Sequence, residues 1–76
     1  MRELDLITPL GVVEGEILSV LDEREKATVG ELQMELDQPR SLVMMAAGAL
    51  IREGLVRGIK QEADFVIVPN RSSHLS

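Results

Sequence analysis

The strongest constraint on the fold is the spacing of helix signals between residues 28 and 54. Thr28 and Glu31 have the spacing of a capping box, in which each side chain accepts a hydrogen bond from the other residue's amide. Residues 37–39, Asp-Gln-Pro, should end that helix, because proline cannot continue a helix but suits the first position of the next one. Gly54 stands where a left-handed residue would end a second helix. The sequence therefore predicts a short helix, a tight turn and a longer helix from residue 39 or 40 to residue 53.

An amphipathic helix is predicted before this pair. Thr8 and Pro9 form a typical helix start, so the helix is expected to span residues 9–22. The apolar residues recur there at spacings of three and four, which describes one buried face: Leu10, Val13, Ile17, Val20 and Leu21. The charged residues 22–26 are expected to form a solvated connection. Residues 4–7, Leu-Asp-Leu-Ile, are expected to form a short strand or merely to pack.

Two apolar runs follow Gly54, at residues 55–59 and 65–68, and predict a β-hairpin joined by the polar residues 60–64. Residues 70–76 are polar without periodicity, so they are expected to form a flexible tail after a domain of residues 1–69. Three helices and a hairpin predict a mainly α, α+β architecture, the winged helix-turn-helix.

The segment TVGELQMELDQPRSLVMMAAGALIREGLV resembles the helix-turn-helix of many prokaryotic regulators, with matching positions at Leu32, Leu36, Val43, Leu50 and residues 54–56. Residues 10–68 also resemble a family of small, stand-alone prokaryotic winged-helix domains of unknown function. That family has two glycines in its first helix, as at Gly11 and Gly15 here, and its third helix ends in a segment matched by Gly48, Leu50, Arg52 and Glu53. This chain has Leu18 and Ala49 where the family tends to have tryptophan.

Composition limits the chemistry of the chain. Its 76 residues are 45% hydrophobic but include one phenylalanine and neither tryptophan nor tyrosine, so the core should be aliphatic. The absence of cysteine excludes disulfides and thiolate metal sites. The lone histidine, His74, stands in the expected tail, and no glycine-rich phosphate loop is present, which argues against an enzyme, a metal or a cofactor. The longest apolar run, residues 42–51, is about half the roughly 20 residues of a membrane span. A cytoplasmic protein without a membrane partner is expected.

The residues that could contact DNA are few. Arg40 and Ser41 stand on the first turn of the third helix, where side chains and amides can meet a phosphate. Arg57 and Lys60 of the hairpin could add phosphate contacts, and Met44 could touch a thymine methyl group. The net charge of −5 opposes binding to a polyanion. We therefore expect any DNA binding to be weak and largely non-specific.

The third helix is apolar on nearly every side, which suggests that a partner covers part of it. Met44 or Met45 is expected to lie in a homodimer interface, and Val12 and Leu18 of the first helix form the competing surface. Two classes of function stay open. One is a DNA-associated transcriptional regulator that acts as a homodimer, and the other is a protein-interaction module that uses the apolar third helix without binding DNA.

Overall fold

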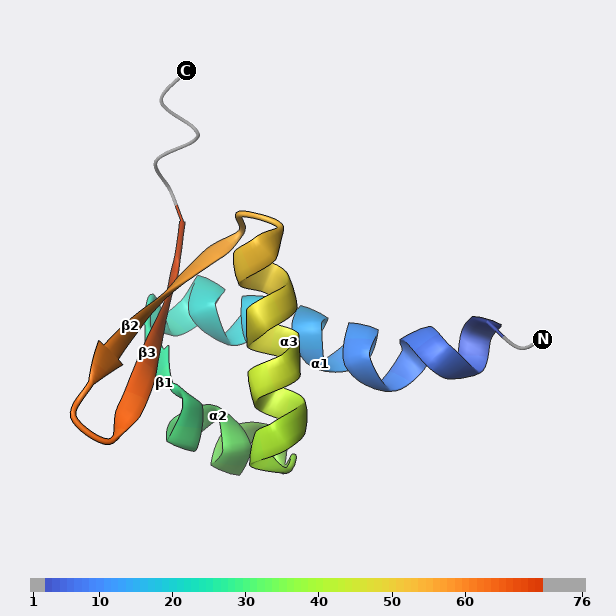
Figure 1. Cartoon of the computed structure of the whole chain (residues 1–76), viewed down its shortest axis with the longest axis horizontal. Coiled ribbons are helices and arrows are strands. Elements are labelled where there is room, and N and C mark those ends of the chain that lie inside the picture. The colour runs from blue at the N-terminus through green and yellow to red at the C-terminus, as the bar shows by residue number, and fades with distance from the viewer. Residues whose placement is uncertain (1–2, 71–76) are drawn as a thin grey trace, which may run out of the picture.

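The computed structural model describes residues 3–70 of the chain, with side chains from residue 9 onward. Three helices and three strands follow one another as α1 (Glu3–Arg24), β1 (Ala27–Thr28), α2 (Val29–Leu36), α3 (Arg40–Arg52), β2 (Val56–Gln61) and β3 (Asp64–Pro69). The strands form one antiparallel sheet in the order β1-β3-β2, and α3 stands beside it (Figure 1). This arrangement confirms the predicted winged helix-turn-helix fold.

The prediction that α1 starts at Thr8 and Pro9 is wrong, because both residues lie inside the helix. Residues 4–7, expected to form a strand or merely to pack, are helical as well. Proline removes one intrahelical hydrogen bond and strains the preceding turn, which weakens a helix locally without ending it in every context. The first turns of α1 project away from the other elements (Figure 1), where no strand of the sheet lies within pairing distance.

The helix pair α2 and α3 has the predicted boundaries. The Thr28 hydroxyl accepts from the Glu31 amide at 3.0 Å, and the Glu31 carboxylate accepts from the Thr28 amide at 2.9 Å, which confirms the capping box. Asp37 ends α2 in the left-handed conformation with a φ of 56°. Gly54, with a φ of 80°, follows α3 as predicted.

Strand β1 was not predicted from the sequence. Ala27 pairs with Ile67 and Thr28 with Val66, so the connection between α1 and α2 becomes the third strand of the sheet. Two residues are too few to show the alternation by which strands are recognised in a sequence. This short pairing joins the helix pair directly to the hairpin.

The hairpin is confirmed, but its loop is shorter than predicted. Only Glu62 and Ala63 lie between the strands, and Gln61 pairs with Asp64 across the turn. Glu62 has a positive φ of 46°, as two-residue turns require at some positions. Lys60 belongs to β2, an edge strand, whose exposed side tolerates charged residues. Asp64 is the first residue of β3, where its carboxylate accepts hydrogen bonds from the Phe65 and Gly30 amides.

The core is aliphatic, as the composition predicts. The buried side chains come from all six elements, with the largest being Ile17, Leu21, Leu32, Leu50 and Ile67. Ala46 in the middle of α3 is fully buried in this core. The tight packing fixes α3 and the hairpin relative to each other, and these two elements form the face described next.

Candidate functional site

The exposed sides of α3 and the hairpin lie together on one face of the molecule, with α1 crossing behind α3 (Figure 1). Charge is distributed unevenly between this face and the rest. Residues 9–38 contain eight acidic and two basic side chains, whereas residues 39–70 contain three acidic and four basic ones. The acidity of the chain is therefore concentrated outside α3 and the hairpin.

Arg40, a predicted DNA-contacting residue, is held by two other elements. Its guanidinium group lies 3.1 Å from the Asp64 Oδ1 atom of β3 and donates a hydrogen bond to the Gln33 Oε1 atom of α2 at 3.1 Å. The Arg40 side chain is still 42% exposed. Ser41 follows on the same turn and is exposed. The first turn of α3 thus presents Arg40 in a fixed position with part of its charge balanced by Asp64.

Asp64 is the polar residue that joins the hairpin to the helix pair, and the sequence analysis missed it. Its carboxylate accepts from the Phe65 amide at 2.7 Å and from the Gly30 amide at 3.0 Å, in addition to its ion pair with Arg40. The Phe65 and Gly30 amides, followed by Arg40, lower the pKa of Asp64 below its ordinary value of 3.8. A Cβ atom at Gly30 would lie 3.1 Å from the Asp64 Oδ2 atom, so glycine is the residue that allows this approach.

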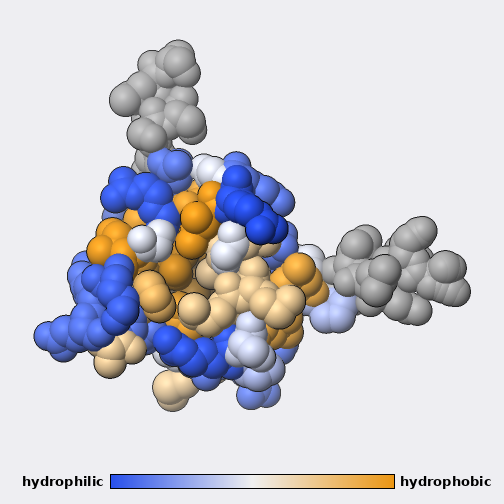
Figure 2. All heavy atoms as spheres, in the orientation of Figure 1, coloured by the Kyte–Doolittle hydropathy of each residue, from blue (hydrophilic) through white to orange (hydrophobic). Residues whose placement is uncertain are grey.

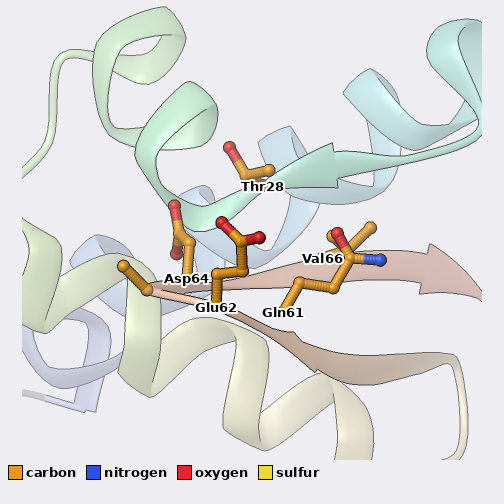
Figure 3. Close-up of a pocket in the computed structure, with 6 residues that line it drawn as sticks. Thr28, Gln61, Glu62, Asp64 and Val66 are labelled. Carbon is orange, nitrogen blue, oxygen red and sulfur yellow. The ribbon is translucent and has the colours of Figure 1, made fainter.

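A shallow hollow of about 490 Å³ lies beside Asp64 at the turn of the hairpin. Figure 3 shows Glu62 and Asp64 pointing from the hairpin toward Thr28 across this hollow. Two carboxylates repel phosphate, so they weaken any contact that Arg40 or Lys60 makes with a nucleic acid backbone at this end of the hairpin.

The two basic residues of β2 lie apart. Lys60 turns back toward the hairpin, because its Nζ atom donates to the Glu62 carbonyl oxygen at 2.6 Å and stands 5.5 Å from the centre of the Phe65 ring. Arg57 is exposed and pairs with Val68 nearer the other end of the strand. The structure therefore places Arg40 and Lys60 near the turn of the hairpin and leaves Arg57 separate from them.

An apolar groove lies between α3 and the hairpin. It has a volume of about 130 Å³ and is lined by Val29, Met44, Ala47, Gly48, Ile51, Gly58, Phe65 and Ile67. Figure 2 shows that apolar residues occupy the centre of this face and that hydrophilic residues surround them. We call it the α3–hairpin groove. The residues that the sequence analysis regarded as unusually apolar for a DNA-reading helix therefore include the lining of a real concave surface.

The two predicted interface surfaces lie on different helices, with Val12 and Leu18 on α1 and Met44 and Met45 on α3. Met44 lines the α3–hairpin groove, whereas Met45 is 60% exposed and lies outside its lining. Val12 is 51% exposed on α1, and Leu18 is partly buried against the core.

Other kinds of site lack support among the described residues. Within residues 3–70, no three His, Cys, Asp or Glu side chains are grouped so that they could hold a metal ion. His74 and the expected flexible tail lie outside the described residues, apart from Asn70. None of the described helices is both long and apolar enough to cross a membrane.

Comparison with known proteins agrees with the fold. The chain is similar to the reduced form of HlyU from Vibrio cholerae N16961, with a TM-score of 0.58 and 21% sequence identity. The match covers 96% of this chain and 85% of HlyU. No family model and no curated protein matches the sequence. The winged-helix fold is shown, and the resemblance to a family of stand-alone winged-helix domains stays a prediction.

Proposed function

We propose that this chain is a non-enzymatic winged-helix domain of a DNA-associated transcriptional regulator and that it acts as a homodimer. The proposal rests on one observation. Helix α3 is exposed beside the hairpin, and residues 39–70, which contain both elements, lack the excess of acidic side chains found in residues 9–38. In helix-turn-helix proteins, the N-terminal residues of the second helix of the motif enter the major groove. In this chain those residues are Arg40 and Ser41.

The expected mode of binding is backbone contact with little sequence reading. Arg40, Ser41, Arg57 and Lys60 are the residues we assign to phosphate, while Met44 offers only a methyl contact to thymine. Asp64 balances part of the Arg40 charge, and Lys60 is bound to the Glu62 carbonyl oxygen. A small number of phosphate contacts predicts weak binding that depends steeply on salt.

Fluorescence anisotropy with a random DNA duplex at low and near-physiological salt tests this proposal. Binding should be detectable at low salt and weaken as the salt concentration increases. The logarithm of the affinity should fall against the logarithm of the salt concentration with a slope of about −0.9 for each phosphate contacted. Arg57→Gln should weaken binding and reduce the salt slope by about 1. The control is Lys26→Gln, which removes an exposed basic residue from the connection before β1 and should leave affinity almost unchanged.

Equal losses in the two variants would contradict binding through α3 and the hairpin. Absence of binding by the parent at low salt would contradict DNA association itself.

The α3–hairpin groove favours a second candidate function, a protein-interaction module that does not bind DNA. Met44 and Ile51, which line the groove, are each more than a third exposed, at 38% and 43%. An apolar centre with a polar rim is typical of protein interfaces. The anisotropy measurement separates the two candidates, because a module of this kind would show no affinity for the duplex at any salt concentration.

A further inference from the structure

Arg40 is the basic residue of the first turn of α3, and both of its terminal nitrogen atoms already have acceptors. Nη2 donates to the Asp64 Oδ1 atom at 3.1 Å, and Nη1 donates to the Gln33 Oε1 atom at 3.1 Å. The Arg40 side chain is nevertheless 42% exposed, so an external anion can reach the guanidinium group. The N–H groups with which arginine binds a phosphate are the same groups that here bind acceptors of the chain itself. A phosphate and Asp64 therefore require the same partner.

Asp64 is the fixed member of this ion pair. Its Oδ1 atom accepts from the Phe65 amide at 2.7 Å, and its Oδ2 atom accepts from the Gly30 amide at 3.0 Å. The Phe65 and Gly30 amides lower the pKa of Asp64 more than Arg40 does, so the carboxylate stays ionised at neutral pH when the arginine leaves. The two backbone hydrogen bonds also hold the carboxylate in place. A contact with phosphate therefore requires Arg40, and not Asp64, to change its partner.

The Arg40–Asp64 ion pair is weak enough to exchange. Both side chains are partly exposed, Arg40 at 42% and Asp64 at 29%, and water and salt screen ion pairs in such positions. Asp64 also shares its two oxygen atoms among three donors, whereas a phosphate can offer two free oxygen atoms to a guanidinium group. A DNA phosphate can thus take Arg40 from Asp64, but the affinity gained is reduced by the contact that is lost.

We propose that Asp64 competes with a DNA phosphate for Arg40, so that the Arg40–Asp64 ion pair inhibits the DNA contact of the first turn of α3. This inference rests on the DNA binding of the proposed function and names the residue that limits its affinity. In the free chain the guanidinium group binds Asp64. In the complex it binds phosphate, while Asp64 keeps its hydrogen bonds to the Gly30 and Phe65 amides.

Fluorescence anisotropy with a random DNA duplex at low salt tests the competition in the full chain. Asp64→Asn keeps a side-chain oxygen that can accept from the Gly30 or Phe65 amide, but it removes the charge that holds Arg40. An exposed ion pair shifts an equilibrium by up to about fivefold. The Asp64→Asn variant should therefore bind the duplex roughly two- to fivefold more tightly than the parent.

Glu62→Gln is the matched control, because it removes the same charge from the same end of the hairpin. Within residues 9–70, no hydrogen bond or ion pair joins the Glu62 carboxylate to Arg40, so this variant should raise the affinity less. Arg40→Gln completes a double-mutant cycle with Asp64→Asn. In the Arg40→Gln chain, Asp64→Asn should change the affinity no more than Glu62→Gln does. Equal effects of Asp64→Asn and Glu62→Gln in the parent, or a full effect of Asp64→Asn without Arg40, would overturn the proposal.

Carbon-13 NMR of the side-chain carboxyl group of Asp64 keeps the test decisive if Asp64→Asn fails to fold. The Arg40→Gln chain gives the chemical shift of this carboxyl group without its arginine partner. Addition of saturating duplex should move the Asp64 signal of the parent toward that value, because Arg40 leaves, and should barely move the signal of Arg40→Gln. An Asp64 signal that stays in place when the parent binds the duplex would show that Arg40 keeps its partner, and the competition would be wrong.

The two measurements together separate this inference from the proposed function. If the parent binds the duplex and Asp64→Asn binds no better than Glu62→Gln, the competition fails and the regulator function stands. If only Asp64→Asn binds the duplex, and this binding requires Arg40, the competition stands and DNA association by the natural chain fails. If none of these chains binds the duplex at low salt, both proposals fail.

Discussion

Asp64 shows how a single carboxylate can position the hairpin of this fold. It accepts two backbone hydrogen bonds, one within β3 and one from the start of α2, and it pairs with Arg40 at the start of α3. The bond to Gly30 spans 34 residues of sequence, which is why no local pattern indicates it. Loss of the carboxylate would leave the hairpin attached mainly through strand pairing and apolar packing.

The lowered pKa of Asp64 predicts a pH-dependent contribution to stability. A carboxylate whose pKa is lower in the folded chain stabilises the fold above its ordinary value of 3.8. This contribution is lost as the pH falls through the folded-state pKa, which lies below 3.8. Asp64→Asn should therefore lower the unfolding midpoint at neutral pH and reduce the loss of stability between about pH 5 and pH 2.

Denaturant unfolding measured across this pH range checks the Asp64 prediction. Glu62→Gln is the control on the same hairpin, because no hydrogen bond to the Glu62 carboxylate is found among residues 9–70. An Asp64→Asn variant with the parent's acid sensitivity would contradict the role assigned to this carboxylate.

At the scale of elements, the helix pair is defined by local signals. The capping box begins α2, Asp37 ends it, and α3 extends from Arg40 to the turn before Gly54. Small residues in the middle of α3 are buried, since Ala46 has no exposed surface and Ala47 has 3%. Helices carrying such residues can approach closely, and a larger side chain has no space to occupy.

Ala46→Leu should therefore destabilise the fold by overpacking the core around α3, at a cost of roughly 1–3 kcal/mol. For a domain of this size, each kcal/mol corresponds to about 4–8 °C in the melting temperature. Thermal melts followed by circular dichroism provide the measurement. Met45→Leu on the exposed side of the same helix should leave the melting temperature nearly unchanged. Equal melting temperatures for Ala46→Leu and the parent would contradict the packing of α3 described above.

At the scale of the whole molecule, the uneven distribution of acidic residues and of exposed apolar residues affects association. Acidic residues are concentrated in residues 9–38. Most of the exposed large apolar residues lie between residues 44 and 59, on α3, on β2 and in the turn between them: Met44, Met45, Ile51, Leu55 and Ile59. A chain of 76 residues buries a limited share of its surface by itself, so covering an apolar face gives a relatively large gain in stability.

A homodimer predicts that the melting temperature rises with protein concentration, because association stabilises the folded chain by mass action. Scanning calorimetry over about a hundredfold range of concentration should show this rise in the parent. The Gly48→Glu variant should melt at one temperature throughout that range if the α3–hairpin groove forms the contact. A parent whose melting temperature stays constant would contradict the homodimer.

Much of the fold could be predicted from the sequence because its signals are local. The capping box, the break at residues 37–39 and the left-handed Gly54 each depend on a few neighbouring residues, and all three are confirmed. The helical periodicity of α1 likewise predicted its buried face correctly. The start of α1 could not be predicted, because the same Thr-Pro pair that can start a helix lies here inside a longer one.

The candidate site depends on contacts that no local pattern encodes. The sequence by itself showed that α3 carries an unusual number of apolar residues, and it predicted Arg40 on the first turn of that helix. Only the tertiary structure decided that Arg40 pairs with Asp64, that Lys60 turns toward Glu62 and Phe65, and that Gly48 and Gly58 face a groove between α3 and the hairpin. The physical reason is distance along the chain. A helix boundary is set by neighbouring residues, whereas a groove or an ion pair requires the chain to fold back and bring remote side chains within a few ångströms.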